Sequence, residues 1–548
     1  MSTIKRAARV KELLSLRFMK EIVSIYLFLM FVIYPLYYEN RYYNMGEAKW
    51  NFFKFWSYSI RTDFIPWFPS ILLFMVAFFI WYQVDLYRKG GLKEYWDFKK
   101  NSILDLFVYA YLALCLISTI LSPYKDTIID GYNGWYMGLK AQVAFVLIYY
   151  FVSRFWRWDE LMLTLYMGVS ALVYLFGILN RFGSDPLGMY EGLDEYYIPQ
   201  FLSTLGQSTW YSSYVCVMLP IGFFIYWQYE KDYIRILSAI YVAMGFMTVI
   251  TDDADSGLFA LVASISALFY FSFEDTKRMK RFIELLIIGL LGWRLVGLLQ
   301  IAMPDKAITF PGLMTFGSQH PIFWLFIAFL CGVYYLIKKA EKNEGFTISK
   351  FKIVRNAYFV FLAAVIVLTT AYIVINTKGM LPDNLSSTNQ YLLFDDSWGN
   401  ARGSSWRITV DSLIKSATGD PMRFIFGAGP DGFFNTVYKY HGDELHEIWG
   451  QDTILTCAHN EWLTQIVNIG LLGGLAYLGI FIGAIIRFAK KSKECPETIA
   501  PILCICSYMA HNFFCYQQII CTPMIFIIIG AGETLCRIGK EPIWEVSQ

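Results

Sequence analysis

The chain has 548 residues, of which 56% are hydrophobic and only 16% are charged, and its formal net charge at pH 7 is +2. A chain of this length ordinarily forms several soluble domains, but this composition and a mean hydropathy of +0.43 exclude every soluble class. Aromatic residues make up 19% of the chain, which is typical of the aromatic belts at the two membrane–water interfaces. The composition therefore predicts a polytopic membrane protein.

A basic segment, residues 1–21, precedes the first apolar run. Its basic residues alternate with apolar ones and are Lys5, Arg6, Arg9, Lys11, Arg17 and Lys20. This pattern is typical of an amphipathic segment that lies on an anionic inner leaflet. Because the following apolar run is long and lacks a small-residue cleavage site, we expect an uncleaved first span.

Fourteen apolar runs are long enough to cross about 30 Å of hydrocarbon as helices. They lie at about residues 22–37, 67–87, 103–121, 139–156, 161–179, 210–226, 234–250, 258–273, 282–303, 322–337, 357–375, 462–488, 502–516 and 519–535. The last two are separated by very few residues and are also compatible with one span plus a re-entrant segment.

Lysine and arginine are distributed unequally between the connecting segments. With the N-terminus inside, the cytoplasmic segments carry 31 of them and the short external segments carry 8. By the positive-inside rule, both termini are cytoplasmic and the long polar stretch is external. We therefore expect an all-α, multi-pass protein of the cell membrane, with about fourteen spans and one large external loop that carries short surface helices. The expected region boundaries are 1–21, 22–375, 376–461 and 462–548.

Two of the ten cysteines, Cys515 and Cys521, flank the last external turn. They are close enough in sequence to form a disulfide, but free cysteine is also common in apolar cores, so both alternatives stay open. Cys504 and Cys506 lack the second ligand pair that a zinc site needs.

The polar stretch contains two arginines and an indole at the start of an expected surface helix. After Trp406, apolar residues recur near helical spacing at Ile408, Val410, Leu413 and Ile414. Arg402 and Arg407 are therefore expected at the first turns of a helix on the membrane surface. A guanidinium beside free helix N–H groups suits a diphosphate, whereas the alternative is an arginine paired with a lipid headgroup.

A histidine and an asparagine stand immediately before the twelfth apolar run. Asn460 is placed to cap the helix that starts there, and the positive end of that helix disfavours an imidazolium at His459. A neutral imidazole is the form that a general base requires, and a purely structural role is the alternative. Upstream, Gly427 and Gly429 mark a sharp turn or a close approach of the backbone to a ligand.

These motifs follow one another as R-x-x-x-W from Arg402, then DP and G-x-G, then HNEWL from His459 and NIGLLG up to Gly473. This order resembles the signature of the O-antigen ligase and polysaccharide polymerase family. The eleven residues from His459 to Gly470 match the interval of the family. The resemblance is close over 401–474 and weaker upstream, at 121–139 and 203–215.

Members of this family are inverting, metal-independent glycosyltransferases that move a glycan from a polyprenyl diphosphate to an acceptor hydroxyl on the outer face of the membrane. The resemblance implies that His459 is the base and that Arg402 engages the donor diphosphate. We assign Arg407, Trp406 and Asn460 to the same substrate site. The implied partners are the lipid-linked donor, a glycan or glycolipid acceptor and membrane lipids, with no cofactor and no nucleic acid.

The sequence departs from the family pattern in a mid-chain element. Where relatives carry Ser-Arg-Gly, this chain has TDDADSGLF, with Ser256 in the position of the arginine, which removes a second cation for the diphosphate. The neighbouring Asp253 and Asp255, with Asp252, have three alternative roles: sugar-hydroxyl binding, a divalent-metal site, or a solvated external turn. Asn468 also replaces a usual acidic residue two positions before Gly470.

Arg294 is a candidate for the missing cation. It lies in the ninth apolar run, about nine residues and so ~14 Å from the outer end. An intramembrane arginine indicates a functional site, with an internal ion pair as the alternative. His511 and Asn512, in the thirteenth run, are explained by hydrogen bonds between helices.

A lipid-linked oligosaccharide flippase is the alternative function from another class. Transporters typically show internal repeats and a midplane site between broken helices, whereas this chain has no evident repeat and concentrates its polar residues in one external loop. A third alternative is an inactive scaffold, against which the presence of both Arg402 and His459 argues. We therefore predict a glycan ligase or polymerase of cell-envelope polysaccharide assembly; the two differ only in their acceptor.

Overall fold

The computed structural model describes residues 13–59, 70–132, 134, 136–308, 312–451 and 454–537. The described part is mostly helical, and its only sheet is a two-stranded antiparallel hairpin of β1 (Phe201–Leu202) and β2 (Gly206–Gln207). The predicted helical class is therefore confirmed. The basic residues of the N-terminal segment up to Lys11 lie outside the described residues, as does Trp67 at the start of the second predicted span.

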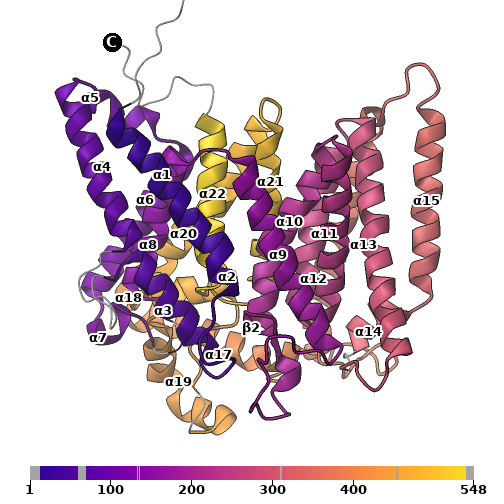
Figure 1. Cartoon of the computed structure of the whole chain (residues 1–548). Helices are drawn as coiled ribbons and strands as arrows, with labels where there is room; N and C mark the ends of the chain where they lie inside the picture. Colours follow the sequence, from indigo (N-terminus) through magenta and orange to yellow (C-terminus); the bar gives the residue numbers. More distant parts are fainter. Residues whose placement is uncertain are drawn as a thin grey trace, which may run out of the picture.

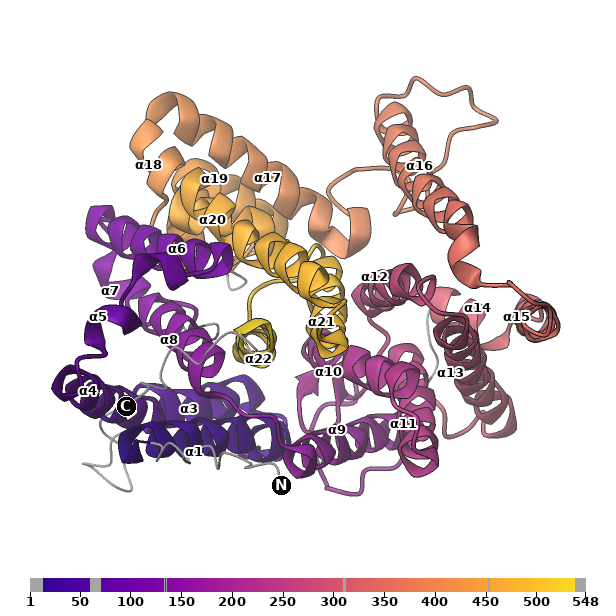
Figure 2. The ribbon, with the colours of Figure 1, turned by 90° about the horizontal axis from the view of Figure 1, so that it is seen from above.

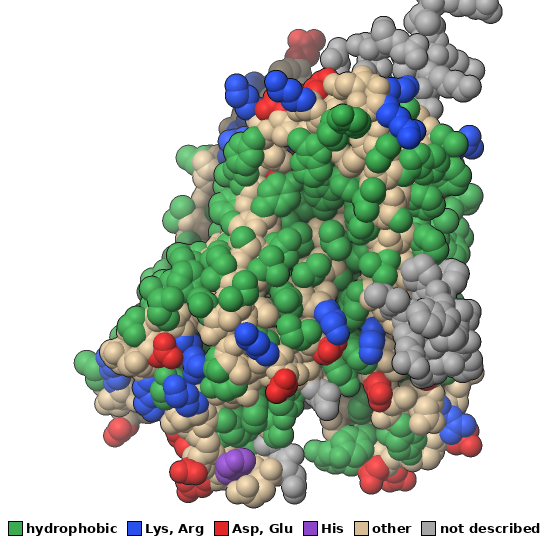
Figure 3. All heavy atoms as spheres, turned by 90° about the vertical axis from the view of Figure 1, so that its left-hand side faces the viewer, with side chains coloured by type: hydrophobic (Ala, Val, Ile, Leu, Met, Phe, Trp, Pro, Cys, Tyr) green, Lys and Arg blue, Asp and Glu red, His purple; other side chains and the backbone are tan. Residues whose placement is uncertain are grey.

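Ten helices in the described part are long and apolar enough to cross a membrane. They are α4 (Ile71–Arg88), α6 (Ile103–Leu121), α9 (Glu160–Arg181), α10 (Ser208–Gln228), α11 (Asp232–Thr251), α12 (Asp255–Ser272), α13 (Thr276–Ala302), α15 (Ile322–Ala340), α16 (Lys352–Thr377, after η4, Ile348–Phe351) and α20 (Glu461–Lys491). Figure 3 shows one face of this bundle, with a broad hydrophobic band and charged side chains gathered toward its two ends.

The other four predicted spans form shorter or interrupted helices. The first is α1 (Leu14–Phe28) followed by the π-helical turn η1 (Leu29–Ile33) and α2 (Tyr34–Leu36), and the rest are α8 (Leu139–Phe155), α21 (Ile499–His511) and α22 (Thr522–Arg537). Because α1 starts at Leu14, Arg17 and Lys20 belong to the first helix itself and not to a separate surface segment. Helix length thus supports ten spans.

The polar stretch after α16 folds into three helices and the turns between them. These helices are α17 (Trp398–Gly419), α18 (Pro421–Phe426) and α19 (Phe433–Trp449). Figure 1 shows them together at one end of the bundle, whereas α1 begins and α22 finishes at the opposite end. The remaining short helices are α3 (Met45–Ser57), α5 (Leu92–Tyr95), η2 (Phe98–Lys100), α7 (Lys125–Ile128), η3 (Ile198–Gln200), α14 (Gly312–Gln319) and η5 (Pro496–Thr498).

Glycines bring the central helices into close contact. A Cβ at Gly245 of α11 would lie 2.1 Å from the side chain of Leu219 of α10, and one at Gly289 of α13 would lie 2.5 Å from Phe246 of α11. Small residues at such contacts are the usual device for packing apolar helices in a membrane. By contrast, α16 has no buried residue in its most apolar window, and Figure 2 shows it standing apart from the bundle.

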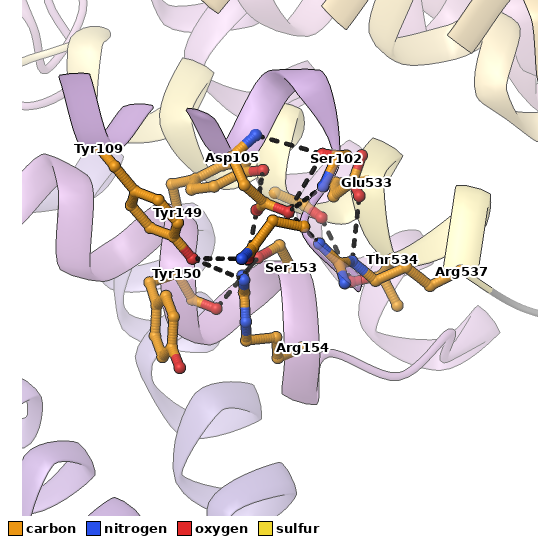
Figure 4. Close-up of polar contacts among 12 residues, drawn as sticks. Ser102, Asp105, Tyr109, Tyr149, Tyr150, Ser153, Arg154, Glu533, Thr534 and Arg537 are labelled. Carbon is orange, nitrogen blue, oxygen red and sulfur yellow. Dashed lines mark hydrogen bonds and ion pairs between the residues drawn. The ribbon is translucent and has the colours of Figure 1, made fainter. Parts of the chain in front are cut away.

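A buried ion-pair network joins four helices at the end opposite α17–α19 (Figure 4). Asp105 of α6 pairs with Arg154 of α8 at 3.3 Å and with Arg537 of α22 at 2.5 Å. Glu533 pairs with Arg537 at 3.0 Å and with Arg487 of α20. Because every carboxylate meets guanidinium groups and removing one partner would leave a buried charge, this network holds α6, α8, α20 and α22 in register.

Candidate functional site

Arg402 follows a left-handed turn at the start of α17. Gly399, Asn400 and Ala401 have φ values of 58°, 63° and 63°, and a residue other than glycine in this region costs about 1–2 kcal/mol. The turn directs the guanidinium of Arg402 back toward the bundle, where Nη1 donates to the Gly399 carbonyl at 2.6 Å and Nε donates to the Phe514 carbonyl at 3.0 Å. Arg402 forms no ion pair with a described carboxylate, so its charge is available to a ligand.

His459 also has left-handed backbone geometry, with φ 49°. The next residue, Asn460, accepts a hydrogen bond from Leu463 N–H at 3.1 Å, which confirms the predicted N-cap of α20. The imidazole packs edge to face against Tyr516, and its Nδ1 lies 3.9 Å from the thiol sulfur of Cys457. Within the described residues, no group hydrogen-bonds to Nε2.

The pKa of His459 is lowered to about 4, chiefly by burial and next by the nearby cation of Arg402. The prediction that this imidazole is neutral therefore agrees with the structure, but the physical causes differ from the helix end on which the prediction rested. The backbone carbonyl of Cys457 favours a proton on the ring. A proton on Nδ1, the atom that faces Cys457, leaves a lone pair on Nε2. Arg402 is thus close enough to His459 for its charge to act on the imidazole.

The connection between α21 and α22 contacts both of these residues, and no sequence motif indicated this role. Its Phe514 carbonyl accepts from Arg402, and two residues later the Tyr516 ring contacts His459. The Tyr516 hydroxyl accepts a hydrogen bond from Nε1 of Trp210 in α10 at 3.1 Å. Cys515, between them, is a free thiol, as is Cys521, so the disulfide alternative does not hold.

Trp406 lies one turn after Arg402 in an aromatic cluster. Its ring is nearly parallel to Phe514, with centroids 6.1 Å apart, and lies 5.1 Å from Trp398. The indole Nε1 is buried without a hydrogen-bond partner. The cluster therefore forms an apolar wall beside Arg402, with one unpaired donor.

The structure does not bring the other two candidate arginines to this site. Arg407 pairs with both carboxylate oxygens of Asp396 at 2.9 Å and with Glu444 at 2.7 Å. Arg294 donates to the His320 carbonyl at 3.1 Å and lies over the Trp324 ring, 5.1 Å from its centroid. The alternative from the sequence was an internal ion pair for Arg294. The structure instead gives its guanidinium a carbonyl and an indole as partners.

Two of the three aspartates of the mid-chain element, Asp253 and Asp255, face different neighbours. Asp255 accepts a hydrogen bond from the Tyr391 hydroxyl at 2.8 Å; burial and this carboxylate raise the pKa of Tyr391 to about 12, while nearby Arg402 opposes the rise. Asp255 thus lies at the edge of the Arg402 site. Burial raises the pKa of Asp253 to about 6, and Arg181 opposes that shift.

The glycines of the two family-like motifs pack against each other. Gly429 N–H donates to the Asn468 carbonyl at 2.8 Å, and a Cβ at Gly427 would lie 2.2 Å from that same oxygen. Gly470, with φ 76°, kinks α20 at this contact. This part of the motif is therefore a backbone lock that holds the 427–432 turn to α20.

Glu461, directly after Asn460, is a buried residue to which the sequence analysis assigned no role. It accepts hydrogen bonds from Tyr508 at 3.0 Å and from Tyr477 and Asn512. The expectation that His511 and Asn512 serve contacts between helices is confirmed for Asn512, since it joins α21 to α20. The sequence signal that could have singled out Glu461 is its place directly after a helix N-cap, where the positive end of the helix stabilises a carboxylate.

No model of a known protein family matches the chain, and no curated protein matches it either. The resemblance in motif order thus stands on the residues alone.

Proposed function

We propose that the protein is a membrane glycosyltransferase of the O-antigen ligase and polysaccharide polymerase type, acting on a polyprenyl-diphosphate-linked glycan. In this proposal the four shorter helices complete fourteen spans, both termini are cytoplasmic and α17–α19 lie outside the cell membrane. The acceptor decides whether the reaction is a ligation or a polymerisation.

The observation that carries the proposal is the proximity of Arg402 to His459, whose pKa is lowered by burial and by this charge. Arg402 lies in α17 and His459 directly precedes α20, and the α21–α22 connection contacts both, through the carbonyl of Phe514 and the ring of Tyr516. His459 has strained backbone and Arg402 directly follows two strained residues, Asn400 and Ala401, and such strain clusters at functional sites. An arginine without a carboxylate partner beside a neutral histidine with an open Nε2 provides the two groups that diphosphate displacement requires.

The proposed reaction is a single displacement at the anomeric carbon of the donor. Nε2 of His459 accepts the proton of the acceptor hydroxyl as its oxygen forms the new glycosidic bond. The bond from the anomeric carbon to the diphosphate oxygen breaks with its electron pair, and the guanidinium of Arg402 stabilises the charge that develops there. Attack opposite the leaving group inverts the anomeric configuration. The Trp398, Trp406 and Phe514 cluster supplies an apolar surface for the first isoprene units.

The test uses the full-length protein in lipid nanodiscs with lipid-linked glycans extracted from the cells that produce it. Mass spectrometry then follows both the release of polyprenyl diphosphate and the mass gained by the acceptor fraction. His459→Ala should lower both by about 10²- to 10⁴-fold, and Asn460→Ala, which loses a cap worth about 1 kcal/mol, should lower them far less. Transport of intact lipid-linked glycan across vesicles, unaffected by His459→Ala, would instead support a flippase.

A further inference from the structure

An apolar groove lies at the end of the bundle opposite α17–α19. Side chains of α1, α9, α10, α21 and α22 enclose it, and Figure 2, which looks onto that end, shows these five helices as neighbours. The groove holds about 120 Å³, and about 1000 Å³ when the space at its open side is included. An apolar cavity of ~150 Å³ takes up benzene, so this groove has room for a segment of hydrocarbon chain.

The lining of the groove is almost entirely apolar. Among the described residues that line it, only Arg157, Asp159 and Glu497 are charged. Met162 of α9 and Met218 of α10 also line it, and the flexible thioether side chain of methionine adapts to the shape of a neighbour. Space with such a lining excludes water, and leaving it empty deprives the lining atoms of contacts. Within a membrane, lipid hydrocarbon is the material that can fill it.

The groove is as long as one leaflet is deep. Its lining begins at Met218 and continues past the end of α10 at Gln228, a distance of about 15 Å at 1.5 Å per residue. Half of the hydrocarbon thickness of a bilayer is also about 15 Å. A single acyl chain of one leaflet therefore fits lengthwise, with its head group at the end where α10 finishes.

The connection between α8 and α9 lines the head-group end of the groove. Trp156 and Trp158 meet there edge to face, with centroids 6.0 Å apart, and tryptophan is enriched at the head-group level of membranes. Arg157, between them, is 44% exposed and lies 3.9 Å from Glu21 of α1, a long, exposed ion pair that contributes little. Glu497 of η5 lines the same groove. A guanidinium and a carboxylate together match the phosphate and the ammonium of a zwitterionic head group.

We propose that this groove binds one acyl chain of a phosphatidylethanolamine-type phospholipid, with the phosphate at Arg157 and the ammonium at Glu497. The site goes beyond glycan transfer and does not depend on it. The chain fills the space between the first turns of α9 and the helices α21 and α22. A polyprenyl chain is the other available hydrocarbon, but a donor held by its diphosphate at Arg402 has its head at the opposite end of the bundle (Figure 1).

The first test fills the groove. Ala531 of α22 lines it and is half-buried, so Ala531→Phe places a benzene-sized ring inside. Ala364→Phe, at an exposed position of α16, is the matched control. Native mass spectrometry follows the full-length protein in detergent as palmitoyl-oleoyl phosphatidylethanolamine is added. We expect the first lipid to bind the wild type and Ala364→Phe equally, and Ala531→Phe about 10-fold more weakly.

Melting temperatures of the same proteins provide the control for folding. Added lipid should raise the melting temperature of the wild type and of Ala364→Phe, and have a smaller effect on Ala531→Phe, because a ligand stabilises only the protein that binds it. If Ala531→Phe does not fold, Ala500→Leu, from the α21 side of the groove, replaces it. Equal affinity for the first lipid in the wild type and the filled variant overturns the proposal.

The second test concerns the head group. Phosphatidylglycerol with the same acyl chains lacks the ammonium, so the wild type should bind it about fivefold more weakly than phosphatidylethanolamine, which is the scale of one exposed ion pair. Glu497→Gln should bring the two affinities within twofold, whereas Arg157→Gln should weaken both. Equal affinity of the wild type for the two phospholipids, or tighter binding of a polyprenyl phosphate than of either, overturns the assignment. A protein that binds the phospholipid but transfers no glycan contradicts only the proposed function.

Discussion

The imidazole of His459 and the ring of Tyr516 meet edge to face, with centroids 5.5 Å apart and planes at 87°. Because Tyr516 is itself hydrogen-bonded to Trp210, α10 holds the ring that orients the histidine. Burial lowers the pKa of His459 to about 4, and the charge of Arg402 adds to this shift. Trp210, from the first half of the chain, thus helps to position the histidine through Tyr516, and Arg402, from the second half, contributes to its low pKa.

The first prediction concerns the pH dependence of transfer. Because the folded pKa of His459 is about 4, against about 6.5 for an unperturbed histidine, the base stays neutral well below neutral pH. We expect a rate that is flat from pH 8 to about 5 and falls as the pH drops through 4. Arg402→Gln removes a cation that lowers this pKa, so its acid limb should move to higher pH, while Arg402→Lys should keep it. An acid limb at the same pH in all three proteins would contradict the coupling.

The same shift has a consequence for stability. Between pH 6.5 and 4 the unfolded chain carries a proton on this histidine that the folded protein does not bind, so acidification favours unfolding. The thermal midpoint of the wild type should therefore fall across this window more than that of His459→Ala. Differential scanning fluorimetry of the two proteins in nanodiscs at several pH values measures the difference.

A second prediction separates the two arginines of α17. Arg407 forms exposed ion pairs with Asp396 and Glu444, and its side chain is 43% exposed, so Arg407→Gln should cost no more than about 1 kcal/mol and leave transfer near the wild-type rate. Arg402→Gln should lower transfer about 10²-fold or more, because it removes the charge opposite the leaving group. Initial rates at saturating donor decide between them. Equal losses in the two variants would return both residues to a structural role.

Sequence patterns predicted the helical class, the polar stretch and the cap at Asn460, because each depends on local spacing, and motif order assigned Arg402 and His459 to one site. They also contained an unused signal about Arg407. Residues five apart on a helix are rotated by about 140°, so Arg402 and Arg407 cannot face the same ligand. The residue types alone did not show which arginine a carboxylate neutralises.

Tyr516 could not have been predicted as a site residue. Tyrosine is a common residue type in an apolar surrounding, and its role arises only because the α21–α22 connection contacts both α10, through Trp210, and α17, through Arg402. The same limit applies to Arg294, whose partners at His320 and Trp324 come from a turn and a neighbouring helix. Tertiary contacts between distant segments leave no periodic signal in the sequence.

A third prediction concerns the backbone lock. At Gly427, with φ 81°, a methyl group would lie 2.2 Å from the Asn468 carbonyl oxygen, and neither atom belongs to a flexible side chain. Gly427→Ala should therefore cost more than ~3 kcal/mol or prevent folding. Gly419→Ala, at a position with nothing within 4 Å of the new methyl, should be neutral or slightly stabilising. Thermal unfolding of the two variants compares them directly, and similar melting temperatures would show that the 427–432 turn can move away from α20.

The last prediction tests the orientation on which an outward-facing site depends. Ser386 lies in the exposed segment between α16 and α17, and Asn343 lies in the exposed turn between α15 and α16, at the other end of α16. In a Cys495→Ser background, which removes a half-buried thiol, Ser386→Cys should react with a membrane-impermeant maleimide on intact cells. Asn343→Cys should react only after permeabilisation, because the proposed orientation places the lysine-rich segments in the cytoplasm. Labelling of Asn343→Cys alone on intact cells would place Arg402 and His459 inside, where lipid-linked glycans are built rather than joined to acceptors, and would refute the proposed function.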